Sequence, residues 1–356
     1  MMRLTSRGLA ALLAAGVVVI ALALWVSSRK PSESPSEAGQ LVLPGLESSV
    51  NGITEVRIRK GDGTKTTLTK GATDWIIGER GFPADSSRVR KLLLDLADLK
   101  IVEEKTSDPA SYAEIGVDDV SSPRSSGALI DLVEPGKTVS LIVGKASGMQ
   151  SSYVRVAGAK QSLLVSPQMI PDADPRRWLD NSVIDLPETR VEQVRVQPAS
   201  GPAYTVLRGS VQQLDFTVPN LPKGRKLSSV SAANSVASAL SSLTLDDVRK
   251  AGSPGASPVH ATFQTFDGLT VDVAGRADGS NRYITLSAKS TTKATEDEAQ
   301  KLNARFGGWE IEILGYRYDS LFQPLDGLLE KPPAAVKTQS KPRRAKAKAA
   351  GEQAAS

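Results

Sequence analysis

The folded part of the chain carries one pattern twice, and this repeat restricts the architecture more than any other feature. The stretch "ITEVRIRKGDGTKTTLTKGATDW" (53–75) has nearly the same order of polar and apolar residues as "VEQVRVQPASGPAYTVLRGSVQQLDF" (191–216). Matched pairs, at an offset of 138 and then 139 residues, are Val56/Val194, Leu68/Val206, Gly71/Gly209 and Trp75/Leu214. Alternation of apolar and polar residues predicts three strands in each copy.

A helix is predicted after the third strand of each copy. In "ADSSRVRKLLLDLADL" (84–99) the apolar residues recur with helical spacing, and Asp85 or Ser86 is a natural N-cap. These residues are Val89, Leu92, Leu93, Leu96 and Leu99. The corresponding stripe of smaller residues in "SSVSAANSVASALSSLTLDDV" (228–248) is Ala233, Val236, Ala237, Leu240 and Leu243. We therefore expect a second helix there, packed more closely or less stably.

Strand-like segments with turn signals follow each helix. The stretch 127–158 echoes 260–288, so that Gly144 answers Gly275 and Tyr153 answers Tyr283. The predicted fold class is α+β: two tandem duplicated units, 45–185 and 186–330, each an antiparallel sheet with one amphipathic helix. Only the first copy contains the insertion "SDPASYAEIGVDDVSSP" (107–123). Only the second ends in 302–329, which predicts a strand pair and a short helix.

The N-terminal segment predicts a transmembrane helix before the two units. Residues 8–26 are free of charge, and about 20 apolar residues are enough to span a bilayer as a helix. A cleaved signal peptide is the alternative, although its apolar region is usually shorter. We expect a cytoplasmic N-terminus (1–7), an anchor (8–27) and a Pro/Ser/Glu-rich linker (28–44). The body would then face the periplasm or the cell exterior, from a single-pass protein of the inner (cytoplasmic) membrane.

Charge is distributed unevenly along the chain. Residues 1–30 carry a net charge of +4, and residues 331–356 carry seven basic residues against Glu352, a net charge of +6. Subtracting these from the formal +5 leaves −5 for residues 31–330. A body of that sign is poorly suited to binding phosphate backbones, so no nucleic-acid partner is expected. The segment 331–356 is predicted to be a disordered basic tail that meets anionic lipid head groups or wall polymers, or is merely solvated.

The residues that usually perform chemistry are scarce. The chain has no cysteine, and His260 is its single histidine, so disulfides, cysteine nucleophiles and zinc sites of several His or Cys ligands are not expected. No Gly-x-Ser-x-Gly elbow accompanies His260. The acidic pairs Glu103/Glu104 and Asp246/Asp247 follow the two helices, and we interpret them as charges on edge strands that prevent association of sheets. The sequence thus predicts no enzyme activity, catalytic residue, metal or cofactor.

The order of several stretches resembles one bacterial family. They include "DWIIGERGFPADSSRVRKLLLDLADL", "YAEIGVDD", "LIVGKASGMQSSYVRV", "DPRRWLDNSVIDLPETRVEQVRV" and "GGWEIEILGYRYDSLF". This order is similar to that of the family called domain of unknown function 4340. The resemblance implies a membrane-anchored extracytoplasmic protein that is often associated with ABC-type transport systems of the gliding-motility auxiliary kind. It implies no catalytic residues, because none is accepted for the family.

Two functions are consistent with these features. The first is an accessory or scaffold subunit of a membrane complex, with the lipid bilayer and ABC transporter permease and ATPase subunits as partners. The alternative is an extracytoplasmic binding module for a polysaccharide, wall polymer or lipid. Aromatic rings suit sugars, so the residues expected to contact a ligand or partner are Trp75, Tyr153, Trp178 and Tyr283.

Overall fold

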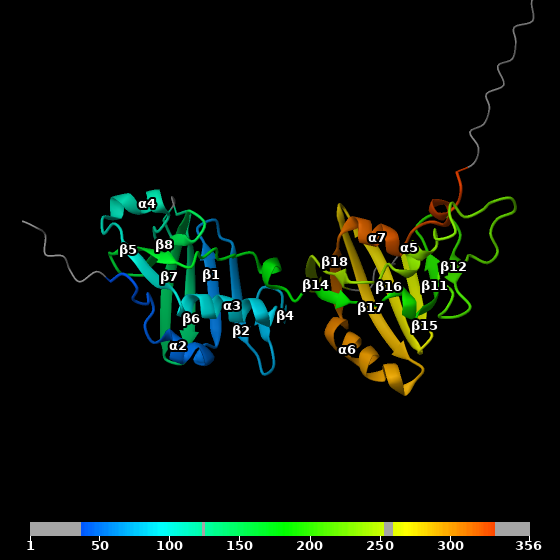
Figure 1. Ribbon diagram of the computed structural model, residues 1–356, viewed down its shortest axis with the longest axis horizontal. Helices are drawn as coiled ribbons and strands as arrows, with labels where there is room; N and C mark the ends of the chain where they lie inside the picture. The colour runs from blue at the N-terminus through cyan, green and yellow to red at the C-terminus, as the bar shows by residue number, and fades with distance from the viewer. Residues whose placement is uncertain (1–36, 123–124, 253–258, 332–356) are drawn as a thin grey trace, which may run out of the picture. The chain divides into compact units, whose positions relative to one another are not determined.

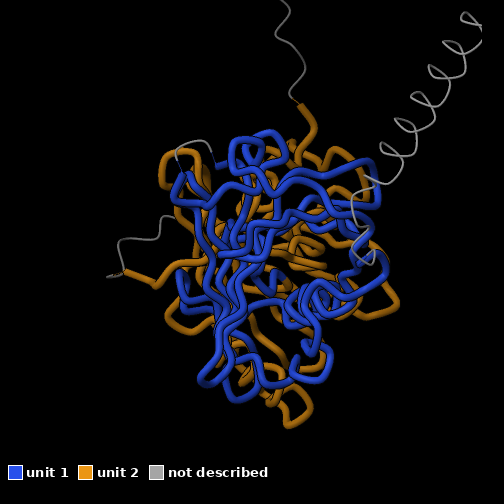
Figure 2. Tube along the Cα trace, turned by 90° about the vertical axis from the view of Figure 1, so that its left-hand side faces the viewer, with its two compact units in different colours: residues 1–181 blue, residues 182–356 orange. Residues whose placement is uncertain are grey.

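The computed structural model describes residues 37–122, 125–252 and 259–331. Two compact units divide the chain, unit 1 (residues 1–181) and unit 2 (182–356), which are coloured separately in Figure 2. The division falls four residues before the boundary expected from the repeat. Both units are α+β structures built on antiparallel sheets (Figure 1).

Unit 1 is built on one antiparallel sheet of nine strands within its described residues. In spatial order these are β4 (Phe82–Pro83), β3 (Trp75–Ile77), β2 (Lys65–Lys70), β1 (Glu55–Lys60), β6 (Ala128–Glu134), β7 (Lys137–Ser147), β8 (Ser151–Val156), β9 (Ser162–Ser166) and β5 (Lys100–Glu104). Shorter elements are α2 (Leu46–Ser49), η1 (Val50–Gly52), η2 (Pro109–Ser111), α4 (Tyr112–Ile115) and η3 (Pro175–Trp178).

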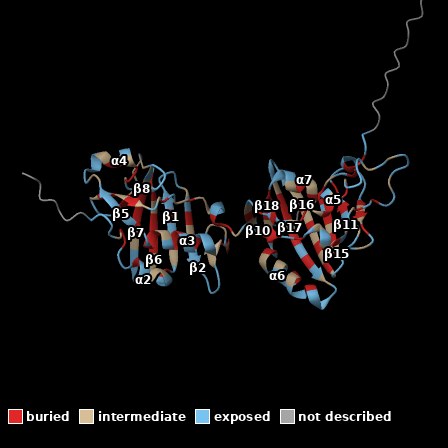
Figure 3. Cartoon of the chain, viewed as in Figure 1, coloured by how far each residue is buried: buried red, intermediate tan, exposed pale blue. Residues whose placement is uncertain are grey.

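The expected first helix is present as α3 (Ser86–Ala97). Its N-cap is Asp85, whose side chain accepts from the backbone N–H groups of Ser87 and Arg88. All five residues of the predicted stripe are buried. They share the core with the apolar residues that alternate along β1, of which Val56 and Ile58 are fully buried. Figure 3 shows such buried positions following the strands of each sheet.

Unit 2 repeats the strand order of unit 1 without its first two strands. Its seven-stranded sheet runs β12 (Tyr204–Leu207), β11 (Val191–Gln197), β15 (Val259–Thr265), β16 (Leu269–Asp278), β17 (Asn281–Ser290), β18 (Trp309–Ile313) and β14 (Asp247–Lys250). The order β2-β1-β6-β7-β8-β9-β5 in unit 1 corresponds to it strand by strand. Two copies of one unit would give this arrangement. The duplication itself remains a prediction.

The remaining elements of unit 2 lie around this sheet. A two-stranded sheet joins β10 (Ser182–Ile184) to β13 (Leu243–Thr244). The helices are η4 (Glu188–Arg190), α5 (Asn234–Ala237), η5 (Lys293–Thr295), α6 (Glu296–Phe306), α7 (Gly315–Leu321) and η6 (Leu325–Leu328).

Four expectations from the sequence need correction. The second copy has no third strand at Leu214, which is 82% exposed in a loop. Its expected helix is the four-residue α5, although the predicted apolar stripe is buried. The segment 302–329 contains one strand, β18, rather than a strand pair. Residues 39–43 of the expected linker are part of the folded body, since Gly39 and Val42 donate to the carbonyls of Ile101 and Leu99.

The match of Gly144 with Gly275 is shifted by one position in the structure. Gly144 lies two residues after Ile142 and so shares its face of the sheet, which is the face away from the core, whereas Gly275 packs beneath the core residue Phe322. A shift of one residue moves a strand position to the opposite face. The residue opposite Tyr283 is Arg276, so Arg276 rather than Gly275 corresponds to Gly144.

The edge positions of the acidic pairs agree with expectation. Glu103 and Glu104 lie on β5, Asp247 lies on β14 and Asp246 precedes it, and both strands end their sheets. Among the described residues, no helix combines the length and the apolar character needed to cross a bilayer. The predicted anchor (8–27) and the tail beyond residue 331 lie outside the described residues.

Candidate functional site

The two predicted tryptophans lie at the start of α3. The carbonyl of Trp75 accepts from the N–H of Ala84, and the carbonyl of Trp178 accepts from the N–H of Asp85 at 2.7 Å. Trp178 is buried, and its indole Nε1 donates to the carbonyl of Asp172 at 2.8 Å. Both residues therefore fix the segment that caps the helix.

Tyr153 belongs to a small hydrophobic cluster on the outer face of the sheet in unit 1, the face opposite Val56 and Ile58. The cluster consists of Tyr112, Val117 and Ile142, with Ile115, Leu129 and Tyr153 packed against it. It is formed where the insertion in the first copy lies on β6 and β7. The backbone of this insertion approaches so closely that a Cβ on Gly144 would overlap the carbonyl oxygen of Ile115.

Arg155 fastens the insertion to the sheet. This side chain is 4% exposed, and its guanidinium donates to the carbonyl of Val117 at 2.9 Å and to the carboxylate of Asp119 at 2.7 Å. It also lies over the ring of Tyr112, 4.7 Å from the centroid. The insertion is thereby held as part of unit 1.

Tyr283 supports an ion-pair cluster on the corresponding outer face of unit 2. The guanidinium of Arg249 lies 3.6 Å from the centroid of the Tyr283 ring. Arg276 and Arg249 both donate to Glu310, at 2.7 Å for the closest contacts. Hydrogen bonds from Arg276 and then Arg249 outweigh burial and hold the pKa of Glu310 below its ordinary value.

These positions do not bring the four predicted residues into one site within either unit. Trp75 and Trp178 lie together, Tyr153 lies in a separate cluster of unit 1, and Tyr283 lies in unit 2. Trp178 and Tyr283 are buried, Tyr153 packs against the cluster around Tyr112, and Trp75 is half-buried. His260 is exposed on β15, opposite Ala274 on one side and Gln197 on the other, neither of which is a nucleophile or an acid. In the described part of the chain, no three His, Cys, Asp or Glu residues are grouped to hold a metal ion.

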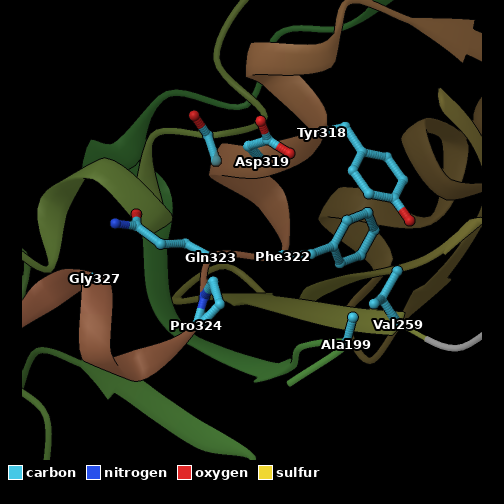
Figure 4. A pocket seen from close by; sticks show the side chains of 9 residues that line it. Ala199, Val259, Tyr318, Asp319, Phe322, Gln323, Pro324 and Gly327 are labelled. Carbon is cyan, nitrogen blue, oxygen red and sulfur yellow. The ribbon is translucent and has the colours of Figure 1, made fainter. Parts of the chain in front are cut away.

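A concave, largely apolar pocket in unit 2 is a candidate site. It has a volume of about 530 Å³ and is formed by α7, the segment 322–324 that follows it, Gly327 in η6, and one residue each from two other segments. The lining residues are Ala199, Val259, Tyr318, Asp319, Ser320, Phe322, Gln323, Pro324 and Gly327. Figure 4 shows the Tyr318 and Phe322 rings on one side of the pocket, with Gln323 toward the other side.

Glycine at position 275 is what allows the aromatic wall of this pocket. A Cβ there would overlap the Phe322 ring and lie 2.8 Å from Cγ2 of Val259. Phe322 thus rests directly on β16, with its ring centroid 4.8 Å from that of Tyr318 at an interplanar angle of 61°. Edge-to-face pairs of this kind are favourable contacts between aromatic rings.

The pocket is mostly apolar with a few polar groups. The hydroxyl of Tyr204 donates to the carbonyl of Gln323 at 2.7 Å and so fixes the chain after α7. Burial raises the pKa of the Tyr318 hydroxyl above its ordinary value. Asp319 is exposed and Gln323 is half-buried. A largely apolar wall with few polar groups can hold an apolar ligand and orient its polar end.

A second cavity of about 520 Å³ lies between the end of β17 and α6, and it is polar. Several of its polar groups are bonded within the fold. Asn303 accepts from the N–H of Ala288 and donates to its carbonyl, and Ser290 and Thr292 bond to Thr295. The cavity therefore has less to offer a ligand than the apolar pocket.

A family model described as Domain of unknown function (DUF4340) matches residues 75–264, more than half of the 356 residues. The chain belongs to this family. The DUF4340 match runs from β3 in unit 1 to β15 in unit 2, so it includes parts of both sheets. No curated protein and no solved structure matches the chain.

The pocket could not have been found from the residues that the sequence singled out. Its lining comes from positions near 199, 259 and 318–327, which are far apart in the chain, and α7 lies beyond the DUF4340 match. One available signal was the aromatic pair of "GYRYDSLFQP", since Tyr318 and Phe322 are four residues apart on one helical face.

Proposed function

We propose that the chain is a non-catalytic accessory or scaffold subunit of an ABC-transporter-linked membrane complex. It is anchored once in the inner (cytoplasmic) membrane through residues 8–27, with its body facing the periplasm or the cell exterior. The observation that favours a non-catalytic role is that charged side chains of both units are bonded within the fold. Arg155, Arg249 and Glu310 are bonded into the fold, and the exposed His260 faces Gln197 and Ala274 on its neighbouring strands, neither of which is a nucleophile or an acid.

The resemblance described above supports the transporter link. The test is purification of the full-length tagged chain in mild detergent, followed by mass spectrometry of what stays bound. Recovery of an ATPase and a permease is the expected result. A matched variant, with residues 8–27 replaced by an unrelated single spanning segment, separates binding by the anchor from binding by the body. Recovery of the chain alone from native membranes would contradict the proposal.

A second candidate is a binding module for a polysaccharide, wall polymer or lipid. The observation that favours it is the pocket of about 530 Å³ in unit 2, and its apolar lining favours the lipid among these ligands. We expect a fluorescent fatty acid to bind the full chain and Ala199→Trp to weaken this binding at least tenfold. Ser200→Trp, at the next exposed position, is the control. Equal binding by both variants would place the ligand elsewhere.

A further inference from the structure

Among the residues that line the apolar pocket of unit 2, Asp319 is the one that is charged. It is exposed on α7, and it has no hydrogen-bond or ion-pair partner in the described part of the chain. The other polar side chains of the lining are those of Tyr318, Ser320 and Gln323. The pocket therefore presents one unpaired negative charge to a ligand.

Two arginines next to the pocket are bonded to the backbone. Arg282 lies 5.8 Å from the centroid of the Tyr318 ring, and its guanidinium donates to two carbonyls at its own hairpin turn. Arg317 precedes Tyr318 on α7 and donates to the carbonyl of Ser242 at 3.4 Å. Neither arginine belongs to the lining. A carboxylate or phosphate head group would thus meet Asp319 without a cation in the lining to balance it.

The pocket has an aromatic end and a polar end. Figure 4 shows the side chains of Asp319 and Gln323 to the left of the Tyr318 and Phe322 rings. The apolar part of a ligand gains most against these rings, because both surfaces leave water there. The polar end of the ligand then lies beside Asp319, at the exposed side of α7.

The charge of that polar end follows from the cost of covering a carboxylate. An unpaired carboxylate loses hydration when a ligand lies over it, and a cation that donates hydrogen bonds offsets this loss. A hydroxyl head group donates one hydrogen bond without charge, and an acidic head group adds repulsion. We propose that the unit 2 pocket binds an amphiphile with a primary amine head group, and that Asp319 is its counterion. This preference rests on the second candidate function, in which the pocket binds a lipid, and it makes a fatty acid a weaker ligand of the same site.

Three ligands of equal chain length test the preference. Octylamine, octanol and octanoic acid are compared as competitors of a neutral fluorescent dye, N-phenylnaphthylamine, bound to the full chain in a non-ionic amphipol. At neutral pH the amine is a cation and the acid is an anion. We expect octylamine to bind about fivefold more tightly than octanol and octanoic acid about fivefold more weakly, which is the effect of one partly exposed ion pair.

Two variants that each remove one negative charge from unit 2 locate the effect. Asp319→Asn should bring the three affinities within about twofold of one another. Glu192→Gln is the matched control, because Glu192 is exposed near the start of β11, seven residues before Ala199. The rise of an extended strand places it roughly 20 Å from the pocket, so this variant should keep the order of the three ligands.

The outcomes separate this preference from the lipid-binding function itself. Octanoic acid that binds as tightly as octylamine would overturn the proposal, and so would an order of affinities that survives in Asp319→Asn. Competition that Ala199→Trp leaves unchanged would instead overturn the second candidate function, since the ligands would then lie outside the pocket.

Discussion

Among the described residues of unit 2, Arg208 is the most deeply buried cation. Its side chain is buried at the end of β12, and its hydrogen bonds in the described residues go to backbone carbonyls, among them those of Val191, Gln213 and Glu188. The guanidinium lies between the rings of Phe216 and Phe266, 5.0 and 5.4 Å from their centroids. It thereby joins η4, the strand β12 and the loop that follows.

We predict that Arg208→Met destabilises unit 2 by about 3 kcal/mol, because buried carbonyls lose their donor. Arg195→Met, at an exposed position of β11, should change stability by no more than about 0.5 kcal/mol. Hydrogen exchange of unit 2 peptides in urea measures both. Equal protection in the two variants would show that water replaces the guanidinium.

Gly144 permits the close contact between the insertion and the sheet in unit 1. In Gly144→Ala the new methyl group would lie 2.9 Å from Cγ1 of Val117 and overlap the backbone of the insertion. We expect a loss of about 2 kcal/mol in the free energy of unfolding of unit 1, as in other overpacked sites. Gly52→Ala is the control, since nothing lies within 4 Å of its new Cβ. Thermal unfolding of both variants compares them directly.

Glu310 should make the free energy of unfolding of unit 2 depend on pH in the acidic range. Its folded pKa lies below the ordinary value of 4.5, so the ion pairs stabilise unit 2 above that pH. This contribution is lost as the pH falls through the folded pKa. In Glu310→Gln the free energy of unfolding should fall less steeply below pH 4.5 than in the parent. Parallel acid titrations for Glu310→Gln and the parent would contradict this role.

At the scale of elements, the two expected helices differ in length, 12 residues in α3 and four in α5, and serine side chains explain the difference. In α3 the stripe is made of valine and leucine, with Asp85 as cap. Around α5, serine side chains bond to nearby carbonyls instead, such as Ser235 to Ala232 and Ser238 to Ser235. Such local bonds compete with the helix, which explains why a buried stripe is carried by only four helical residues.

The cap of α3 gives a prediction for that element. Hydrogen bonds from Ser87 and Arg88 outweigh desolvation and lower the pKa of Asp85. Asp85→Ala should cost about 1 kcal/mol at neutral pH. Because the folded pKa is lowered, this difference should vanish as the pH falls through it. Asp98→Ala at the other end of α3 should be neutral or slightly stabilising, since a carboxylate is unfavourable at a helix C-terminus. Circular dichroism during urea unfolding tests both.

The strands of the first copy and the meanders of both copies could be predicted from alternation, because each has one buried and one open face. Leu214 could not be placed, since an apolar residue in a loop looks the same in sequence as one in a strand. The faces of Gly144 and Gly275 depend on register, which alternation alone does not fix. Trp178 and Tyr153 were predicted to contact a ligand or partner, but η3 buries Trp178 and the insertion half-buries Tyr153, and both are tertiary features.

At the scale of the whole molecule, the two units should unfold independently. Each has its own sheet and buried core. We expect Gly144→Ala to lower the midpoint of one calorimetric transition and Arg208→Met to lower that of the other. Trp75 and Trp178 report unit 1 and Trp309 reports unit 2, so fluorescence can assign each transition. A single transition that shifts in both variants would show that the units are coupled.

The placement of the strand after the helix has a consequence for synthesis of the chain. In both units this strand lies at the sheet edge and pairs with a strand more than sixty residues later, Ile101 with Val165 and Val248 with Ile311. Neither sheet can close until its last strand has left the ribosome or the export channel. Until then the edge strand is open to wrong pairing, so the chain should need protection by a chaperone twice during its production, once for each half.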